Sequence, residues 1–170
     1  MRFLAFIGAL GLIVAIVAVA FFFGGFFNIA ASEQDPAPVA WVLIHVREAS
    51  IDHHATDTPP KSLDDPATIR AGARAFADRG CVLCHGGPGA QWAKFSEGLN
   101  PGPPDLKELA GELEPAEVFW VVKHGIRMTG MPSFGAAGVP DAEIWSIAAF
   151  VKKLPTVSEA DFKAWSTATP

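Results

Sequence analysis

The chain has 170 residues, of which 50% are apolar and 18% are charged, and its net charge is −5 at pH 7. This length allows one ordinary domain with an appendage, and the acidic balance excludes a protein that binds nucleic acid by neutralising phosphates. The 2 cysteines allow at most one disulfide, so a disulfide framework is excluded as well.

Residues 3–27 form one apolar segment that contains no charged residue and no proline. A helix of this length spans roughly 37 Å, whereas the hydrocarbon core of a bilayer is about 30 Å thick. We therefore predict a transmembrane anchor over residues 1–27. The length favours a retained anchor over a secretory signal, whose apolar core has about 7–15 residues, although Ala30-Ala31-Ser32 also fits a cleavage site.

The charges on either side of this segment predict its orientation. Arg2 precedes it, whereas Glu33 and Asp35 are the first charges after it and Arg47 is the next basic residue. The positive-inside rule then places the N-terminus in the cytoplasm and everything after Asn28 in the periplasm. The expectation is a single-pass protein of the inner (cytoplasmic) membrane.

Residues 28–63 are expected to form an extracytoplasmic tether. Ala31 to Pro38 is polar and holds two prolines, and Val39 to Val46 is apolar but too short to span a bilayer. If the second stretch is helical, Trp41 and His45 share one side. That arrangement suits an interfacial or partner-docking helix and equally a helix packed on its own domain. Thr56 to Lys61, which contains Pro59-Pro60, indicates a linker.

Residues 64–170 are predicted to form the main domain, built from short helices. Asp65 suits the N-cap of the first helix, Pro66 its first position and Gly80 its end. Three further helices are expected, from Glu114-Pro115 to Gly125, from Asp141 to Pro155, and after Ser158. The second should bury Val118, Val121 and Val122. No stretch shows sustained strand alternation, so the predicted fold class is all-α.

A long irregular segment separates the first two of these helices. Residues 86–111 show little periodicity and include four prolines. A loop of this length is usually functional or wrapped around something. Short helices around so much irregular chain need a large apolar object at their centre, and a haem would supply it.

The motif Cys81-Val82-Leu83-Cys84-His85 is C-x-x-C-H, the attachment signature of a c-type haem. On one helical turn the two thiols face the same side and reach the two vinyl groups of one porphyrin, and His85 follows as the proximal iron ligand. A thioredoxin-like pair would open a helix after a strand, and no strand is expected before Cys81. A zinc site would need more cysteine or histidine ligands nearby. The motif therefore predicts one covalently bound haem c.

The candidates for the second iron ligand are Met128, Met131 and His124. His124 is expected at a helix end and exposed to solvent. Met131 is favoured because Gly130 frees the chain before it and Pro132 fixes the chain after it, which suits a side chain aimed at a flat cofactor. Met128 would then pack near the haem edge.

These features resemble the membrane-anchored, single-haem class I cytochromes c. The resemblance covers about Asp64 to Pro155 and is strongest in CVLCH (81–85), PPDL (103–106), HGIRMTGMP (124–132) and IAAFVKKLP (147–155). It implies a small helical shell around the haem and one-electron transfer between ferric and ferrous iron. In this family the terminal helices cross where a glycine meets an aromatic side chain, and Gly72, Phe76 and Phe150 fit that crossing.

The resemblance also implies roles for single residues. The methionine of a Gly-Met-Pro stretch is the second iron ligand in the family, which again points to Met131. A proline carbonyl of a Gly-Pro-x-Leu loop holds the ligating histidine. This chain has an extra proline there, so either Pro103 or Pro104 could supply the carbonyl. Pro104 is favoured because it directly precedes x-Leu.

Five aromatic residues are expected to line the haem pocket or to fill the core: Trp92, Phe119, Trp120, Phe134 and Trp145. Basic residues are scattered among acidic ones, and the chain after Asn28 carries a net charge of −6, since Arg2 alone of the 13 basic residues precedes it. No basic docking face for a strongly acidic partner is therefore predicted.

Together these features predict an electron carrier, which is not itself an enzyme because His85 and Met131 would close both axial positions. Its redox partners would be a quinol-oxidising complex or dehydrogenase as donor and an oxidase or reductase as acceptor in a respiratory-type chain. Two alternatives stay open. One is a fixed haem subunit of a larger membrane oxidoreductase, docked through the Phe-rich anchor or the Val39–Val46 stretch. The other is a haem peroxidase or gas sensor with a labile methionine.

Overall fold

The computed structural model describes residues 2–167, and among these residues it contains helices and no β-strand. The predicted all-α fold class is thereby confirmed. The chain divides into two compact units, Met1–Gln34 and Asp35–Pro170.

The first unit is a single long helix with a short extension. Helix α1 (Arg2–Phe23) has 22 residues, and none of its side chains is buried. Within residues 2–167 it is the one helix long and apolar enough to cross a membrane, judged by length and composition. The apolar N-terminal segment thus has the form expected of a membrane anchor.

The second unit begins with a helix that is longer than the sequence suggested. Helix α2 (Ala37–His54) has 18 residues, whereas the apolar stretch Val39–Val46 marked less than half of it. No glycine or proline interrupts the chain between Val39 and His54, so nothing ends the helix earlier. The predicted tether over residues 28–63 therefore contains this helix, which belongs to the same compact unit as the helices after it.

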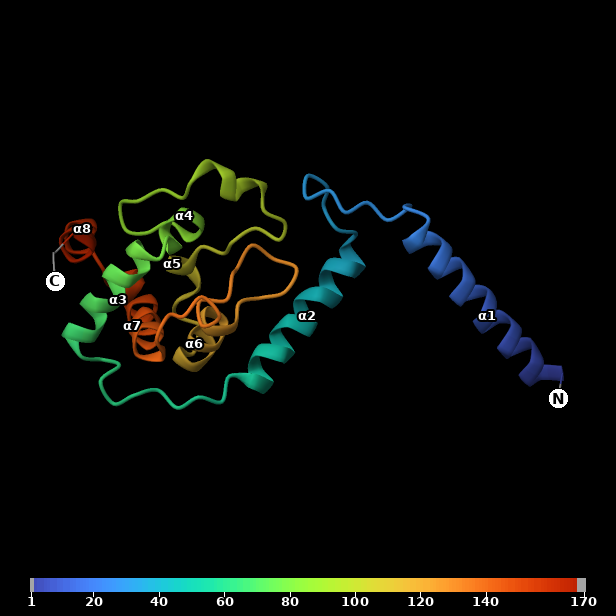
Figure 1. Ribbon diagram of the computed structural model, residues 1–170, viewed down its shortest axis with the longest axis horizontal. Coiled ribbons are helices and arrows are strands. Elements are labelled where there is room, and N and C mark those ends of the chain that lie inside the picture. Colours follow the sequence, from blue (N-terminus) through green and yellow to red (C-terminus); the bar gives the residue numbers. More distant parts are fainter. Residues whose placement is uncertain (1, 168–170) are drawn as a thin grey trace. The chain divides into compact units, whose positions relative to one another are not determined.

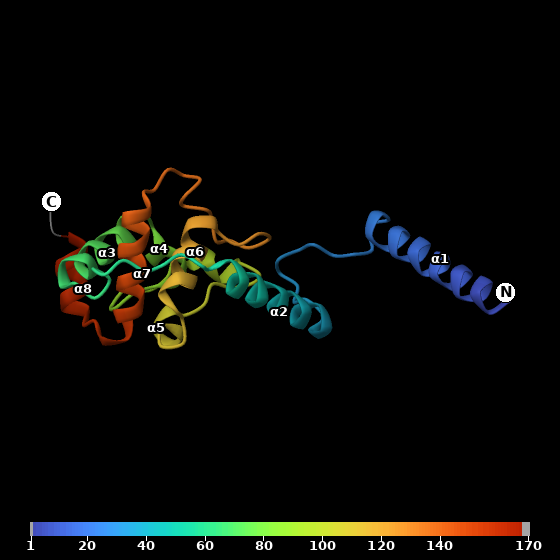
Figure 2. The same cartoon turned by 90° about the horizontal axis from the view of Figure 1, so that it is seen from below.

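Helix α3 (Pro66–Asp78) begins where the capping residues predict. The Asp65 carboxylate accepts a hydrogen bond from the backbone N–H of Ala67 at 3.0 Å, and Pro66 opens the first turn. Helix α3 crosses helix α7 (Asp141–Lys153), and both views show the two helices against each other (Figure 1, Figure 2).

The crossing of α3 and α7 is centred on Gly72. A Cβ atom at this position would lie 2.5 Å from the carbonyl carbon of Ser146 and 2.9 Å from the Cβ atom of Phe150. The rings of Phe76 and Phe150 pack beside it, with 5.3 Å between their centroids. The predicted meeting of a glycine with an aromatic residue is confirmed.

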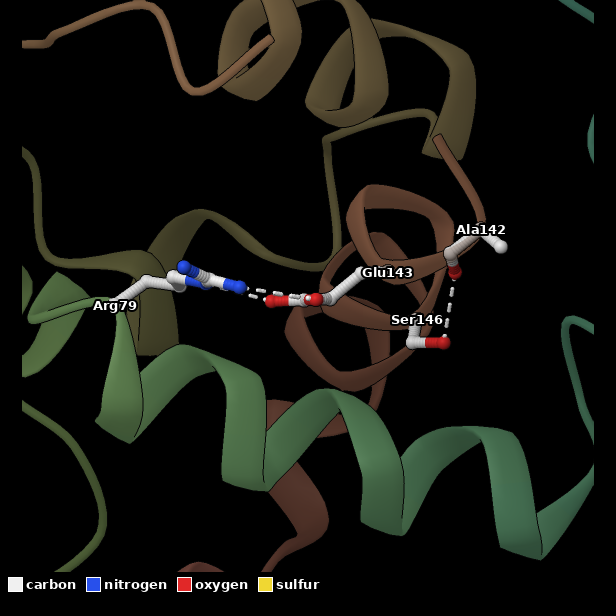
Figure 3. Close-up of polar contacts among 4 residues, drawn as sticks. All are labelled: Arg79, Ala142, Glu143 and Ser146. Carbon is white, nitrogen blue, oxygen red and sulfur yellow. Dashed lines mark hydrogen bonds and ion pairs between the residues drawn. The ribbon is translucent and has the colours of Figure 1, made fainter. Parts of the chain in front are cut away.

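An ion pair joins the end of α3 to the first turn of α7. Arg79 donates from Nε to Oε1 of Glu143 at 2.7 Å and from Nη2 to Oε2 at 3.2 Å (Figure 3). These hydrogen bonds raise the pKa of the Arg79 guanidinium. One turn further along α7, the Ser146 hydroxyl donates to the Ala142 carbonyl at 3.0 Å, so it bonds within its own helix.

Helix α6 (Pro115–His124) packs on α7 and also begins where predicted. The Glu114 N–H donates to the Glu117 carboxylate at 2.9 Å, which completes a capping box. The face that α6 buries differs from the expected one, because Phe119 and Val122 are buried while Val118 and Val121 are half-buried. The Phe119 ring is large enough to reach α7, where it stacks on another aromatic ring.

Helix α8 (Glu159–Thr167) closes the domain against α3, as the predicted short terminal helix. Its Phe162 stacks on Phe150 at 5.5 Å between ring centroids. The largest fully buried side chains are apolar except for one serine: Phe76, Phe119, Phe150, Ile144, Ile147, Leu154, Val151 and Ser96. The core therefore lies where α3, α6, α7 and α8 meet.

The long segment after α4 (Cys81–His85) holds two short helices that the sequence did not indicate, η1 (Lys94–Gly98) and α5 (Leu106–Leu109). Figure 1 shows this chain in yellow-green, leaving α4 and returning to α5. The Ala93 N–H donates to the Leu83 carbonyl at 2.8 Å, which ties the segment back to α4. A last short helix, η2 (Leu154–Thr156), follows α7.

Candidate functional site

The two cysteines lie on one helical turn at the end of α3. Gly80, with φ of +76°, is the N-cap of α4 and follows the C-cap of α3, so a left-handed residue separates the two helices just before the motif. Cys81 is buried, Cys84 is half-buried, and both are free thiols. Burial raises the pKa of the Cys81 thiol to about 12. Redox-active cysteine pairs instead contain a thiol of lowered pKa, so this environment does not suit thiol–disulfide exchange.

His85 ends the same turn and its ring is fixed by the backbone of the long loop. Its Nδ1 atom lies 3.0 Å from the carbonyl oxygen of Pro104. Because a carbonyl can only accept, Nδ1 carries the proton and Nε2 keeps a free lone pair. Burial lowers the pKa of His85, while the hydrogen bond to Pro104 acts in the opposite direction. The sequence left open whether Pro103 or Pro104 bonds to His85, and in the structure the hydrogen-bonded carbonyl is that of Pro104.

A second part of the site is the methionine loop, residues 125–135, which follows α6. The Ile126 N–H donates to the Met131 carbonyl at 3.1 Å and closes the loop. The Thr129 hydroxyl donates to the Ile126 carbonyl at 2.8 Å and accepts from the Met131 N–H at 3.1 Å. Both backbone groups of Met131 are therefore held, which restricts where its thioether can point.

The two methionines of this loop differ in their surroundings. Met131 is half-buried and packs against the hydrophobic core. Met128 has φ of 60° and is 96% exposed, and it does not pack on the core. The difference follows from the loop closure, since the hydrogen bonds that hold Met131 leave Met128 at the tip.

The methionine loop is also attached to the end of α6. The Ser133 hydroxyl and the Gly135 N–H both donate to the Lys123 carbonyl, at 2.7 and 3.0 Å, and the Phe134 N–H donates to the Val122 carbonyl at 3.1 Å. These bonds satisfy carbonyls that the helix end leaves without partners. The loop thus has a defined position relative to α6.

Thr129 and Ser133 were not identified as site residues from the sequence. Their hydroxyls make the side-chain-to-backbone bonds that shape the methionine loop. A threonine two residues before Met131 is a known turn-forming arrangement and could have served as the signal.

The aromatic residues divide between core and surface. Phe119 and Trp145 stack at 4.0 Å between ring centroids in the core, and Phe134 is half-buried against it. Trp92 is 46% exposed and does not fill the core, so lining the haem pocket stays the prediction for this residue. Trp120 is half-buried and lies beside the exposed His124, with 5.2 Å between the ring centroids.

These groups fit a covalently attached haem. They are two free thiols three residues apart, an imidazole with an unprotonated Nε2 directly after them, and a methionine on a loop closed by hydrogen bonds. Among residues 2–167, no cluster of three or more histidine, cysteine or acidic side chains could hold a bare metal ion. An all-α domain with this site defines a c-type cytochrome.

A comparison with protein families assigns the chain to one family of c-type cytochromes. The family model described as cytochrome C oxidase, cbb3-type, subunit III, matches residues 67–151, which is half of the chain, and the chain belongs to this family. The match runs from the first turn of α3 to the last turn of α7 and includes the whole site. Membership implies haem c, iron and electron transport. No curated protein and no solved structure matches the chain.

Proposed function

We propose that the protein carries single electrons through one haem c, bound to Cys81 and Cys84 with His85 and Met131 as the axial ligands. The hydrogen bond between His85 and Pro104 is the observation that supports this most directly, because it leaves Nε2 free to coordinate iron beside two free thiols. A bound haem with one imidazole and one thioether ligand supplies reversible one-electron chemistry at a raised potential.

The residues of the chain would act by holding these ligands in place. Pro104 fixes the tautomer and the ring orientation of His85. The Thr129 hydroxyl accepts from the Met131 N–H, and the Ile126 N–H donates to the Met131 carbonyl. With both axial positions filled, no coordination site is left for a substrate. The protein would therefore act as a carrier rather than as an enzyme.

The proposed location is the cytoplasmic membrane, with the haem domain in the periplasm. Arg2 before the apolar helix, and Glu33 and Asp35 after it, support this orientation. A quinol-oxidising complex or a dehydrogenase would be the donor, and an oxidase or reductase the acceptor. Confinement to the membrane would raise the effective concentration of the carrier near such partners.

A second candidate function is that of a fixed electron-transfer subunit in a larger membrane oxidoreductase. The description of the matching family, which names subunit III of an oxidase, supports it. Purification from native membranes in mild detergent separates the two. A mobile carrier elutes alone in gel filtration, whereas a fixed subunit elutes with a stoichiometric partner.

The ligand assignment is tested by visible spectra of Met131→Ala with Met128→Ala as its matched control. The wild type is expected to be low-spin, with a far-red sulfur–iron band when oxidised and with no carbon monoxide binding when reduced. Met131→Ala should lose the band, and Met128→Ala should keep it because Met128 is 96% exposed. The opposite pattern would assign Met128 instead. A high-spin wild type that binds carbon monoxide would support a peroxidase or gas sensor.

A further inference from the structure

The first half of α2 presents an apolar stripe to solvent. Val39, Val42, Leu43 and Val46 are spaced by three and four residues, so they share one face of the helix. Their exposed fractions are 36%, 48%, 55% and 61%. We call these four residues the α2 stripe. Four large apolar side chains in a row are more than the scattered exposed residues that a protein surface normally carries.

The contacts of α2 with its own domain lie beside the stripe and in the second half of the helix. Ala40, Arg47 and Ile51 are half-buried and lie about a quarter turn round the helix from the stripe. Ser50, which is also half-buried, continues the line of the stripe into the second half of the helix. At the end of α2, His54 lies over Trp120 of α6, with 5.8 Å between ring centroids. The domain therefore holds α2 without covering the stripe.

We propose that the α2 stripe docks into the lipid surface of the same membrane that α1 crosses. This proposal takes α1 to be a retained anchor. Thirteen residues, 24–36, connect the two helices. Such a chain reaches at most about 45 Å and has a typical end-to-end distance of roughly 20 Å, so α2 stays close to the bilayer surface.

The distribution of charge in α2 favours a lipid surface as the occupant. No charged residue occurs from Pro36 to Val46, and the charges begin at Arg47, in the half that ends on α6. Outside the stripe, Trp41 and Ile44 are also exposed, by 61% and 41%, so the whole uncharged half of α2 offers apolar surface. The chain after Asn28 has a net charge of −6, so apolar contact rather than attraction to anionic lipid would hold the helix.

Docking of the stripe would orient the haem domain. One end of α2 is fixed on α6 through His54 and Trp120, and α6 continues directly into the methionine loop. If the first half of α2 lies in the lipid interface, the haem domain would therefore have one fixed orientation and would present the same side to partners in the membrane.

The test uses the full-length holoprotein in phosphatidylcholine nanodiscs, with a nitroxide spin label at Leu43→Cys and, as the matched control, at Glu48→Cys. Both positions are exposed on the same helix. When the haem occupies Cys81 and Cys84, the introduced cysteine is the one free thiol. This condition rests on the proposed function and is checked beforehand by the c-type visible spectrum, so its failure is recognised separately.

The measurement is the accessibility of each label to oxygen, which concentrates in lipid, and to a polar nickel chelate, which stays in water. The oxygen-to-nickel ratio at position 43 is expected to exceed that at position 48 several-fold. Equal, water-like ratios at both positions would overturn the proposal. A label at position 43 that neither reagent reaches would also overturn it, because protein rather than lipid would then cover the stripe.

Discussion

Replacing Gly72 by alanine should destabilise the domain, because α3 and α7 touch backbone to backbone at this residue. The added Cβ atom would overlap the Ser146 carbonyl oxygen and lie 2.5 Å from its carbonyl carbon. Carbon atoms pack at about 3.5–4.0 Å, so the helices must separate by about 1 Å. That displacement would also loosen the packing of Phe76 on Phe150.

The size of the effect follows from two opposing contributions. Overpacking a core costs about 1–3 kcal/mol, and the upper end applies because the obstacle is backbone that cannot rotate away. Alanine recovers about 1 kcal/mol through its higher helix propensity. The net expectation is a loss of about 2 kcal/mol in the free energy of unfolding.

The assay is urea unfolding of the oxidised holoprotein in detergent micelles, followed by far-ultraviolet circular dichroism. Gly98→Ala is the matched control, because a Cβ atom at position 98 meets nothing within 4 Å and the added methyl group enters open space. The control should unfold like the wild type. If Gly72→Ala were as stable as the wild type or more stable, the inferred backbone contact between α3 and α7 would be refuted.

Two further predictions concern hydrogen bonds. Thr129→Val removes the hydroxyl that bonds Ile126 and Met131, so the methionine loop should lose about 1–3 kcal/mol of stability and the far-red sulfur–iron band should disappear at a lower urea concentration. Thr129→Ser keeps a hydroxyl and should keep the band to the same urea concentration as the wild type. Visible spectra along the titration check this, and a valine variant as resistant as the serine variant would contradict it. Asp65→Ala removes the N-cap of α3 and should lower the free energy of unfolding by about 1 kcal/mol, whereas Asp65→Asn keeps an acceptor. Equal losses in these two variants would show that the capping bond is not responsible.

The sequence by itself determined the ends of the main helices, the fold class and the haem-attachment motif. The starts of α3 and α6 depend on a capping residue followed by a proline, and these interactions lie within a few residues of one another. The C-x-x-C-H spacing is equally local, because one helical turn is enough to place Cys81, Cys84 and His85. The apolar segment over residues 3–27 likewise identified α1 without any tertiary contact.

Only the tertiary structure decided which distant groups meet. The choice between Pro103 and Pro104 depends on where a loop 19 residues from His85 places its carbonyl. The exposure of Met128 and the burial of Met131 result from a loop that is closed by Thr129 and tied to α6.

The same holds for the aromatic residues and for α2. Phe119 rather than Val121 is buried because its ring reaches Trp145 on α7, and Trp92 lies on a loop that leaves it exposed. The full length of α2 and its contact through His54 with Trp120 also depend on packing across the chain. Caps, turns and motifs act over a few residues and can be recognised in the sequence, whereas the partners of a side chain across the chain depend on how the helices pack.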